Sequence, residues 1–404
     1  MPMDIILFDL PEIRTSLLPL TYTRPVAMIR SGILTIAEKW RLAGFDNVSF
    51  LTPGYLGQKF PTAVSGDNTL INGAALPSPE LCDRIKNLRL GEGLTSDGTL
   101  VAARLDRKGL EELEKTGFQP EGLAVSELAA TMIRHTWDIF HLNGGQIRED
   151  YAALTRGRRS APVGDSHTIV YGAENIFIED GVKIKAAILN AEGGPIYLGR
   201  NSEVQEGAII RGPFALCESA VVNMGAKIRG DSTFGPFCKV GGEVGNSVLF
   251  GYSNKGHDGY MGNSVVGEWC NLGADTNTSN LKNTYMPVKV WSYASERFVN
   301  TGLQFCGLVM GDHSKCGINT MFNTGTVVGV MANIFGSGFP RAMIPSFAWG
   351  GAAGFSTFEL GKALATAEAA MKRRNVALTE TDKKILEKIF EDSAKYRVWE
   401  RSGN

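Results

Sequence analysis

One stretch of the chain reads Leu198-Gly-Arg-Asn-Ser-Glu-Val204-Gln-Glu-Gly-Ala-Ile-Ile210, and its spacing of apolar residues continues beyond it. Every sixth residue is apolar eight times in succession: Leu198, Val204, Ile210, Leu216, Val222, Ile228, Phe234 and Val240. If roughly 40% of positions are apolar, such a run has a probability on the order of one in a thousand. A repeat of six residues is typical of parallel β-helices, in which each short strand turns a corner and stacks on the coil below.

The same period resumes farther along the chain, at Val266 and Leu272 and again at Met310, Cys316, Phe322 and Val328. Small residues stand four positions after an apolar one, where the coil would turn: Ser202, Cys238 and Cys270. A β-sandwich is the competing interpretation, but its alternation has a period of two and does not single out every sixth residue. We therefore expect a left-handed parallel β-helix over residues 176–350.

The chain on either side of the repeat has a different pattern. Residues 1–155 alternate short apolar runs with helical stretches, which is typical of an α/β domain. Residues 155–164 are polar and basic and contain Gly and Pro, so we expect a linker over 156–175. After Thr357 the chain is rich in Ala, Leu, Glu and Lys at helical spacing, which predicts a helical segment over 351–404 that caps the solenoid.

The composition narrows the class of function. The 404 residues include 41 basic and 42 acidic side chains, so no net basic field favours nucleic acid or an anionic membrane, and small-molecule partners are expected. The first residues lack the cationic opening of a signal peptide, and no apolar run approaches the roughly 18 residues of a membrane span. The six cysteines form no CxxC pair. These features favour a cytoplasmic protein with reduced thiols.

The repeat is interrupted twice, between Val240 and Val266 and again from about Asp275 to Val309. Insertions in a solenoid tend to emerge as loops on one face, where function often lies. Within the first interruption a histidine begins the segment His257-Asp-Gly-Tyr260-Met-Gly262-Asn-Ser-Val-Val-Gly267-Glu-Trp-Cys-Asn271-Leu-Gly273-Ala274.

This segment resembles the bacterial family of bifunctional N-acetylglucosamine-1-phosphate uridylyltransferases and glucosamine-1-phosphate acetyltransferases. The family's stretch around its catalytic histidine has the form His-x-x-Tyr-x-Gly-x-x-x-x-Gly-x-x-x-Asn-x-Gly-Ala, and this chain matches every fixed position. The resemblance implies an acetyl-CoA-dependent acyltransferase that acts on an amino-sugar phosphate and forms a homotrimer.

The resemblance also implies roles for single residues. Amide formation requires a neutral amine, so His257 would be the general base, because an imidazole titrates near neutral pH. Glu243 would orient the imidazole, and the backbone N–H of Ala274 would stabilise the oxyanion. No metal is required for this step, and the resemblance leaves any metal site unknown.

The substrate-binding residues implied by the resemblance are Arg229, Tyr260, Asn271 and Asn280. The family's phosphate-binding lysine is Gly245 here, so Lys255 is the expected replacement for its charge. The asparagines also fit stacked amide ladders, and Arg229 also fits a solvated face. A non-enzymatic scaffold or a metal-dependent hydratase is a third possibility, but the repeat region after residue 200 has only His257 and His313.

The N-terminal α/β domain resembles sugar nucleotidyltransferases, which have a Rossmann-like fold, through Pro19-Leu-Thr-Tyr-Thr-Arg24-Pro25. Their glycine-rich phosphate loop is missing, and Asn72-Gly73 stands where a Gly-Asp that holds Mg²⁺ is expected. The candidate residues in this region are Arg14, Arg24, Arg30 and Asp138.

Two alternatives remain open for this domain. In one it transfers a nucleotide from a nucleoside triphosphate to a sugar 1-phosphate, making UDP-N-acetylglucosamine or a related nucleotide sugar with Mg²⁺ as cofactor. In the other it is catalytically silent and regulates or scaffolds the acyltransferase.

Overall fold

The computed structural model describes residues 3–403, with side chains up to Glu400, and the chain divides into two compact units. The N-terminal unit contains the chain up to Leu17, Thr23–Ile29 and Leu34–His135. The solenoid unit contains Leu18–Tyr22, Arg30–Ile33 and the chain from Thr136 onward. Helix α6 (Asp138–Thr155) belongs to the solenoid unit, because it packs on strands of the solenoid.

The N-terminal unit is built around a six-stranded sheet with the order β2-β1-β3-β5-β4-β6. Its strands are β1 (Ile5–Phe8), β2 (Val48–Leu51), β3 (Asn68–Asn72), β4 (Glu92–Ser96), β5 (Thr99–Leu105) and β6 (Ala124–Glu127). β1 runs parallel to β2 and β3, whereas β5 runs antiparallel to β3 and β4. The expected α/β domain is therefore confirmed, with a mixed sheet.

Helices connect these strands: α1 (Pro11–Ser16), α2 (Ile36–Leu42), α3 (Gly54–Gly57), α4 (Pro79–Lys86) and α5 (Arg107–Lys115), with the 3₁₀ helix η1 (Val26–Met28). β1 and β3 are buried throughout, as expected for short apolar strands covered on both faces. α2 begins at a capping box in which Thr35 and Glu38 bond each other's backbone N–H groups.

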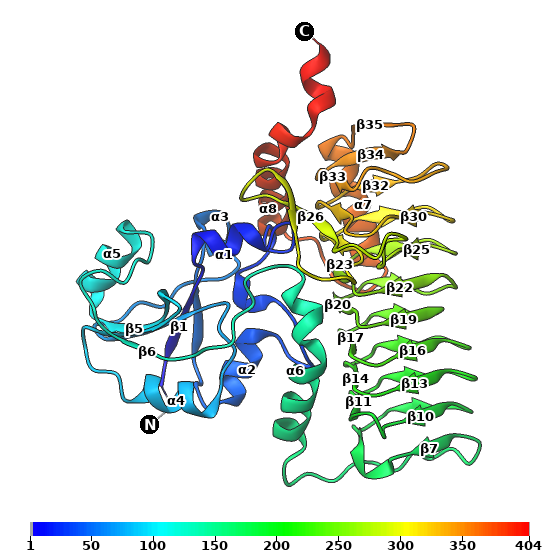
Figure 1. Ribbon diagram of the computed structural model, residues 1–404, viewed down its shortest axis with the longest axis horizontal. Helices are drawn as coiled ribbons and strands as arrows, with labels where there is room; N and C mark the ends of the chain where they lie inside the picture. The colour runs from blue at the N-terminus through cyan, green and yellow to red at the C-terminus, as the bar shows by residue number, and fades with distance from the viewer. Residues whose placement is uncertain (1–2, 404) are drawn as a thin grey trace. The chain divides into compact units, whose positions relative to one another are not determined.

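The solenoid consists of three sheets whose strands stack coil upon coil (Figure 1). Sheet 1 contains β7 (Ile169–Tyr171), β10 (Ile188–Asn190), β13 (Ile209–Arg211), β16 (Lys227–Arg229), β19 (Glu243–Gly245), β22 (Tyr260–Gly262), β25 (Asn277–Thr278) and β30 (Met321–Phe322). Sheet 2 contains β8 (Ile176–Ile178), β11 (Ile196–Leu198), β14 (Phe214–Leu216), β17 (Ser232–Phe234), β20 (Val248–Gly251), β23 (Val265–Glu268), β28 (Val309–Met310), β31 (Val327–Val328) and β33 (Met343–Ile344).

Sheet 3 contains β9 (Lys183–Ile184), β12 (Glu203–Val204), β15 (Val221–Val222), β18 (Lys239–Val240), β21 (Asn254–Lys255), β24 (Asn271–Leu272), β29 (Lys315–Cys316), β32 (Asn333–Ile334), β34 (Ala348–Gly351) and β35 (Gly354–Thr357). Neighbouring strands are parallel in all three sheets, apart from β35, which folds back antiparallel on β34. The 3₁₀ helix η2 (Ala173–Asn175) precedes β8.

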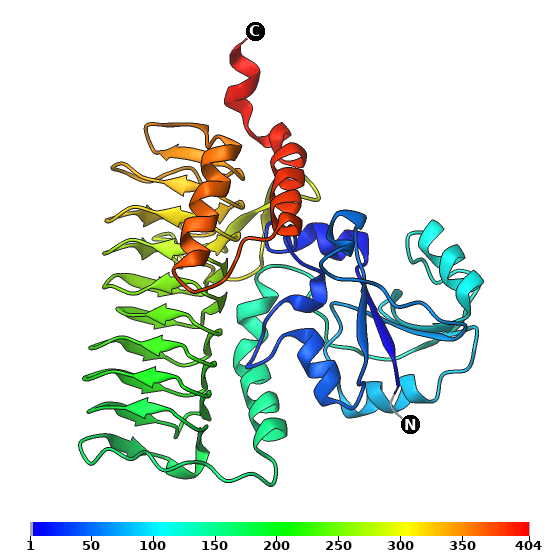
Figure 2. The same ribbon diagram turned by 180° about the vertical axis from the view of Figure 1, so that it is seen from behind.

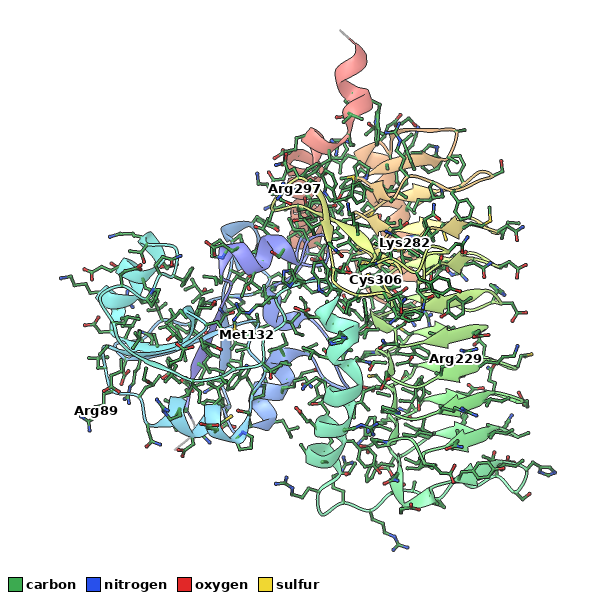
Figure 3. The ribbon with its side chains drawn as sticks, in the orientation of Figure 1. Arg89, Met132, Arg229, Lys282, Arg297 and Cys306 are labelled. Atoms are coloured by element: carbon green, nitrogen blue, oxygen red, sulfur yellow. The ribbon has the colours of Figure 1, made fainter. Side chains whose placement is uncertain are left out.

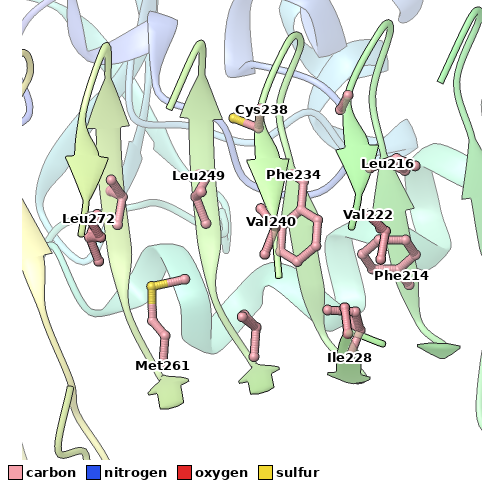
Figure 4. Close-up of a cluster of buried hydrophobic side chains, with 14 of the residues drawn as sticks. Phe214, Leu216, Val222, Ile228, Phe234, Cys238, Val240, Leu249, Met261 and Leu272 are labelled. Atoms are coloured by element: carbon pink, nitrogen blue, oxygen red, sulfur yellow. The ribbon is translucent and has the colours of Figure 1, made fainter. Parts of the chain in front are cut away.

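The residues of the six-residue repeat form the core between the three sheets. All eight from Leu198 to Val240 are at most 2% exposed. Phe214 and Phe234, one coil apart, pack edge to face with ring centroids 5.2 Å apart (Figure 4). Because each buried aliphatic or aromatic side chain contributes about 1.5–3 kcal/mol, this column accounts for the stacking of the coils. The parallel β-helix expected from the spacing is confirmed.

The two interruptions of the repeat differ in the structure. Between Val240 and Val266 the coils continue, and the inward positions pass through Val244, Leu249, Lys255 and Met261 at spacings of four to six residues. The expected loop is therefore absent there. Residues 279–308 do leave the coils, and this inserted segment contains the hairpin β26 (Lys289–Ser292) and β27 (Arg297–Asn300). Figure 3 labels Lys282, Arg297 and Cys306 in it.

The C-terminal segment forms two helices, α7 (Leu360–Lys372) and α8 (Glu380–Asp392), followed by the 3₁₀ helices η3 (Ala394–Tyr396) and η4 (Val398–Gly403). They begin later than residue 351 because β35 extends sheet 3 to Thr357. Figure 2 shows α7 lying along the coils. In the described part of the chain, every helix is too short or too polar to cross a bilayer.

Candidate active site

His257 lies on the tight corner that leads from β21 in sheet 3 to β22 in sheet 1. The backbone of this corner is held from two sides. The side-chain amide of Asn223, one corner below, donates to the carbonyl oxygen of Gly256 at 2.7 Å. The ammonium of Lys255 donates to the carbonyl oxygens of His257 and Asp258 at 2.8 and 3.1 Å. The imidazole itself is exposed and, within residues 3–403, makes no hydrogen bond or ion pair.

Three of the predicted residues line one groove of about 810 Å³: His257, Asn271 and Ala274. Asn271 projects outward from β24, one coil above Asn254. The carbonyl oxygen of Ala274 accepts a hydrogen bond from the Asn319 N–H at 2.8 Å, whereas the N–H of Ala274 has no partner among the described residues. A residue with a candidate base and a residue with a candidate oxyanion donor therefore line the same groove.

Basic side chains line the same groove. They come from sheet 3, as Lys239 and Lys315, and from the end of α7, as Arg373 and Arg374. A guanidinium nitrogen of Arg374 donates to Asn254 Oδ1 at 3.1 Å, which joins α7 to β21. Lys315 donates to the carbonyl oxygen of His313 at 3.0 Å, and burial lowers the pKa of its ammonium. The groove is thus suited to an anionic ligand.

A stack of rings runs along the corner between sheets 2 and 3, beside this groove. The centroids of Phe237 and Tyr252 are 4.8 Å apart, those of Tyr252 and Trp269 are 4.1 Å apart, and His313 follows at 6.2 Å from Trp269. All four residues have φ between 53° and 61°. Stacking of neighbouring rings helps to offset the roughly 1–2 kcal/mol that a left-handed backbone costs. Tyr252 and Trp269 also line the groove.

This stack and the α7 cations were not among the residues predicted from the sequence. The aromatic stack has a signal in the repeat, because each ring precedes a small residue at the same position of successive coils: Cys238, Ser253, Cys270 and Ser314. The arginines at the end of α7 have no such signal in the sequence, since they lie more than a hundred residues beyond Asn254 in the chain.

A second cluster of predicted residues lies on the outer face of sheet 1. A guanidinium nitrogen of Arg229 is 2.7 Å from a carboxylate oxygen of Glu243, and Arg229 is 71% exposed (Figure 3). The amide of Asn280 donates to the Tyr260 hydroxyl at 3.0 Å and to Asn263 Oδ1 at 2.7 Å. Burial raises the pKa of the Tyr260 phenol. These side chains present a cation, a hydroxyl and an amide on one face.

The structure corrects two of the predicted roles. Glu243 was expected to orient His257, but it binds Arg229, because both project from the outer face of adjacent strands β19 and β16. Lys255 was expected to face a substrate phosphate, but it occupies an inward position and is 1% exposed. Its ammonium is directed at backbone carbonyls.

The candidate residues of the nucleotidyltransferase region are divided between the two units. Arg30 and Asp138 belong to the solenoid unit, so only Arg14 and Arg24 remain in the N-terminal unit. Arg14 forms a buried ion pair with Asp9 at 2.7 Å and also donates to the carbonyl oxygen of Arg24 at 3.0 Å. Burial raises the pKa of Asp9, and the charge of Arg14 opposes this effect. Arg14 therefore holds together the helical turn that replaces a glycine-rich loop.

The place expected to hold Mg²⁺ offers no carboxylate. Asn72, at the end of β3, is 1% exposed, and its side chain bonds the Ala74 N–H and the carbonyl oxygen of Leu100, at 3.0 Å each. In the described part of the chain, no three His, Cys, Asp or Glu side chains gather as metal ligands would. The residues present there do not fit the metal site that the resemblance implies.

Comparison with known proteins confirms the resemblance. A family model described as sugar nucleotidyl transferase matches residues 5–159. The bifunctional protein GlmU of Methanocaldococcus jannaschii is 38% identical over 87 residues, which are 22% of this chain and 21% of that protein. A bifunctional sugar-1-phosphate nucleotidylyltransferase/acetyltransferase of Sulfurisphaera tokodaii is 29% identical over 160 residues, which are 39% of this chain and 37% of that protein.

The matched stretches thus span less than two-fifths of these relatives' own lengths. Among solved structures, the polySia-specific acetyltransferase NeuO is similar at 15% identity, with a TM-score of 0.26 over 48% of this chain and 83% of that one.

Proposed function

We propose that this chain, which is similar to bifunctional sugar nucleotidylyltransferase/acetyltransferases, transfers an acetyl group from acetyl-CoA to the amine of an amino-sugar phosphate such as glucosamine 1-phosphate. One observation carries the proposal: the exposed His257 and Ala274, whose N–H has no partner among the described residues, line one groove. A base and an oxyanion donor in a shared groove are what acyl transfer to an amine requires.

The chemistry follows from these groups. His257 accepts a proton from the amine as its nitrogen forms a bond to the thioester carbon. The carbonyl oxygen becomes an oxyanion, which accepts a hydrogen bond from the Ala274 N–H. Collapse of this intermediate breaks the carbon–sulfur bond, and the proton held by His257 passes to the departing thiolate of coenzyme A. No net proton is consumed within the enzyme.

The charged residues supply binding. Lys239, Arg373 and Arg374 line the groove and would pair with the phosphates of acetyl-CoA. On sheet 1, Arg229 and the hydroxyl and amide of Tyr260 and Asn280 would hold the phosphate and hydroxyl groups of the sugar. Asn271, which lines the groove beside His257, would position the amine.

The test is an assay of free thiol with purified protein, acetyl-CoA and glucosamine 1-phosphate. His257→Ala should lower kcat/KM by about 10²- to 10⁴-fold, the usual contribution of a general base. His167→Ala, another exposed histidine of the solenoid unit, is the matched control and should behave as wild type. Equal rates in the His257→Ala variant and wild type would refute the assignment.

A second candidate function is nucleotidyl transfer to a sugar 1-phosphate, favoured by the family match over residues 5–159. Its test is pyrophosphate release from a nucleoside triphosphate with Mg²⁺ and an N-acetylhexosamine 1-phosphate. Release would support a bifunctional enzyme. No release with any of the common nucleotides would favour the alternative, in which this unit regulates or scaffolds the acyltransferase.

We also propose that the protein assembles as a homotrimer. The proposal rests on the resemblance to acyltransferases with parallel β-helices. Light scattering coupled to size-exclusion chromatography would report a mass of three chains, and a stable monomer with full activity would contradict it.

A further inference from the structure

A lysine occupies a position in the solenoid core where neighbouring coils have apolar side chains. β21 pairs with β18 so that Lys255 is opposite Val240, and the coils below have Val222 and Val204 at the same inward position. Lys255 is 1% exposed. Burying an ammonium is costly unless each of its N–H groups finds an acceptor. A residue with this cost calls for a role that an apolar side chain would not fill.

The three acceptors of Lys255 are all backbone carbonyl oxygens. Its Nζ lies 2.8 Å from the oxygen of His257, 3.1 Å from that of Asp258 and 3.3 Å from that of Gly241 on the coil below. Asn223 donates to the carbonyl oxygen of Gly256. The side chains of Asn223 and Lys255 thus bind the carbonyl oxygens of three consecutive residues, 256–258. The corner that carries the candidate base is therefore tied to the core and to the coil beneath it.

We propose that Lys255 is a positioning residue for acyl transfer, whose ammonium holds the corner of His257 to the solenoid core and so fixes where the imidazole enters the groove. The inference rests on the proposed function of His257. Lys255 touches no substrate, because its ammonium is enclosed by the coil. Lys255 acts through the backbone of His257, the residue proposed to contact the substrate.

Stability and activity distinguish this role from a purely structural one. Replacing buried charges by well-packed apolar groups of similar volume is often neutral or stabilising. A lysine kept for positioning therefore lowers stability while it raises kcat. A lysine kept for the fold alone would affect both quantities in the same direction.

The charge of Lys255 adds a pH dependence. Burial lowers the pKa of its ammonium to about 8, against the opposing effects of the Asp258 and Asp275 carboxylates and the Cys316 thiol that face it. Above this pH the amine has two N–H groups for three carbonyls, so the corner loosens. The pKa in the unfolded chain is higher, so the unfolded state binds more protons between the two values, and stability rises with pH across that interval.

The experiment compares Lys255→Met with Leu249→Met, a substitution of similar size in the core of the same coil. In Lys255→Met we expect kcat to fall by about tenfold to a hundredfold, as for a misplaced catalytic group, with an apparent Tm equal to or above that of wild type. Amide hydrogen exchange of a peptide spanning residues 254–262 should accelerate, because the loosened corner no longer holds the Tyr260 N–H steadily against its acceptor, Asn277 Oδ1. In wild type we expect kcat to decline above a pH of about 8, where Lys255 loses its charge. This decline should be absent in Lys255→Met. Leu249→Met should retain wild-type kcat and exchange.

A third variant, Lys255→Gln, keeps two donors and should recover part of the kcat lost in Lys255→Met. Wild-type kcat and exchange in Lys255→Met would overturn the proposal, as would a loss of kcat matched by an equal loss of Tm in both variants. If wild type itself shows no acetyl transfer, the proposed function fails. The exchange rates then still decide whether Lys255 holds this corner.

Discussion

Replacing Gly259 by alanine should destabilise the solenoid through two separate effects at the corner of His257. Gly259 has a φ of +108°, a conformation that costs an L-residue about 1–3 kcal/mol. An added Cβ would also lie 2.2 Å from the carbonyl oxygen of Thr276 in the coil above. Because a backbone atom cannot swing aside, the coils must separate locally, at about 1–3 kcal/mol. The two effects together predict a loss of about 2–6 kcal/mol.

Two other glycines separate these contributions. Gly225 has a φ of +69° but open space around a Cβ, so Gly225→Ala carries only the backbone strain, about 1–2 kcal/mol. Gly241 lacks a positive φ, but its Cβ would lie 2.5 Å from the carbonyl oxygen of Gly256, so Gly241→Ala carries only the contact. The losses from these two substitutions should add up to roughly that of Gly259→Ala.

The assay is thermal unfolding followed by circular dichroism at one scan rate, with kcat measured on the same samples. At about 2–4 °C for each kcal/mol, Gly259→Ala should lower the apparent Tm by roughly 4–24 °C. It should also lower kcat, because Gly259 lies two residues after His257, whereas Gly225→Ala should leave kcat near wild type. A Tm for Gly259→Ala no lower than that for Gly225→Ala would refute the tight stacking of these coils.

Three further predictions concern the core, the ion pair and the groove. Phe234→Ala should lower the free energy of unfolding by about 3–5 kcal/mol in chemical denaturation, because Phe234 is fully buried. Phe339→Ala, at a half-exposed site, should change it little. Equal effects of the two substitutions would contradict the assigned core. Arg14→Met should cost about 3–5 kcal/mol by leaving Asp9 buried without its cation, and the added change Asp9→Asn should recover part of that loss, so an Arg14→Met variant as stable as wild type would argue against a structural ion pair. Arg373→Ala and Arg374→Ala should each raise KM for acetyl-CoA about two- to fivefold at low salt. The effect should be smaller at high salt, because dissolved ions screen exposed charges. A KM unchanged at low salt would place the phosphates of acetyl-CoA elsewhere.

The core of the solenoid could be predicted because burial acts at every coil. Leu198 and Val204 must both face a narrow interior, so their spacing in the sequence follows the length of each side of the coil. The prediction was wrong between Val240 and Val266 for a local reason. Gly241 and Gly242 make a corner two residues shorter than the one after Val222, so the period slips without any loop.

Lys255 shows why a polar residue in a repeat is easily misread. A charged side chain suggests solvent, and the carbonyl oxygens that make its burial tolerable belong to residues on both sides of it in the folded coil. His257, Asn271 and Ala274 could be grouped because consecutive coils bring them together. The α7 cations could not, because their place depends on how a distant helix packs.

The ring stack beside the groove gives the protein a built-in optical probe. Of the chain's six tryptophans, Trp269 is the one among the residues that line the groove, and its ring lies between those of Tyr252 and His313. Its emission therefore depends on what displaces water from the groove and on the charge of the neighbouring imidazole. The difference in fluorescence between wild type and Trp269→Phe would isolate this signal and allow ligand occupancy to be titrated without turnover.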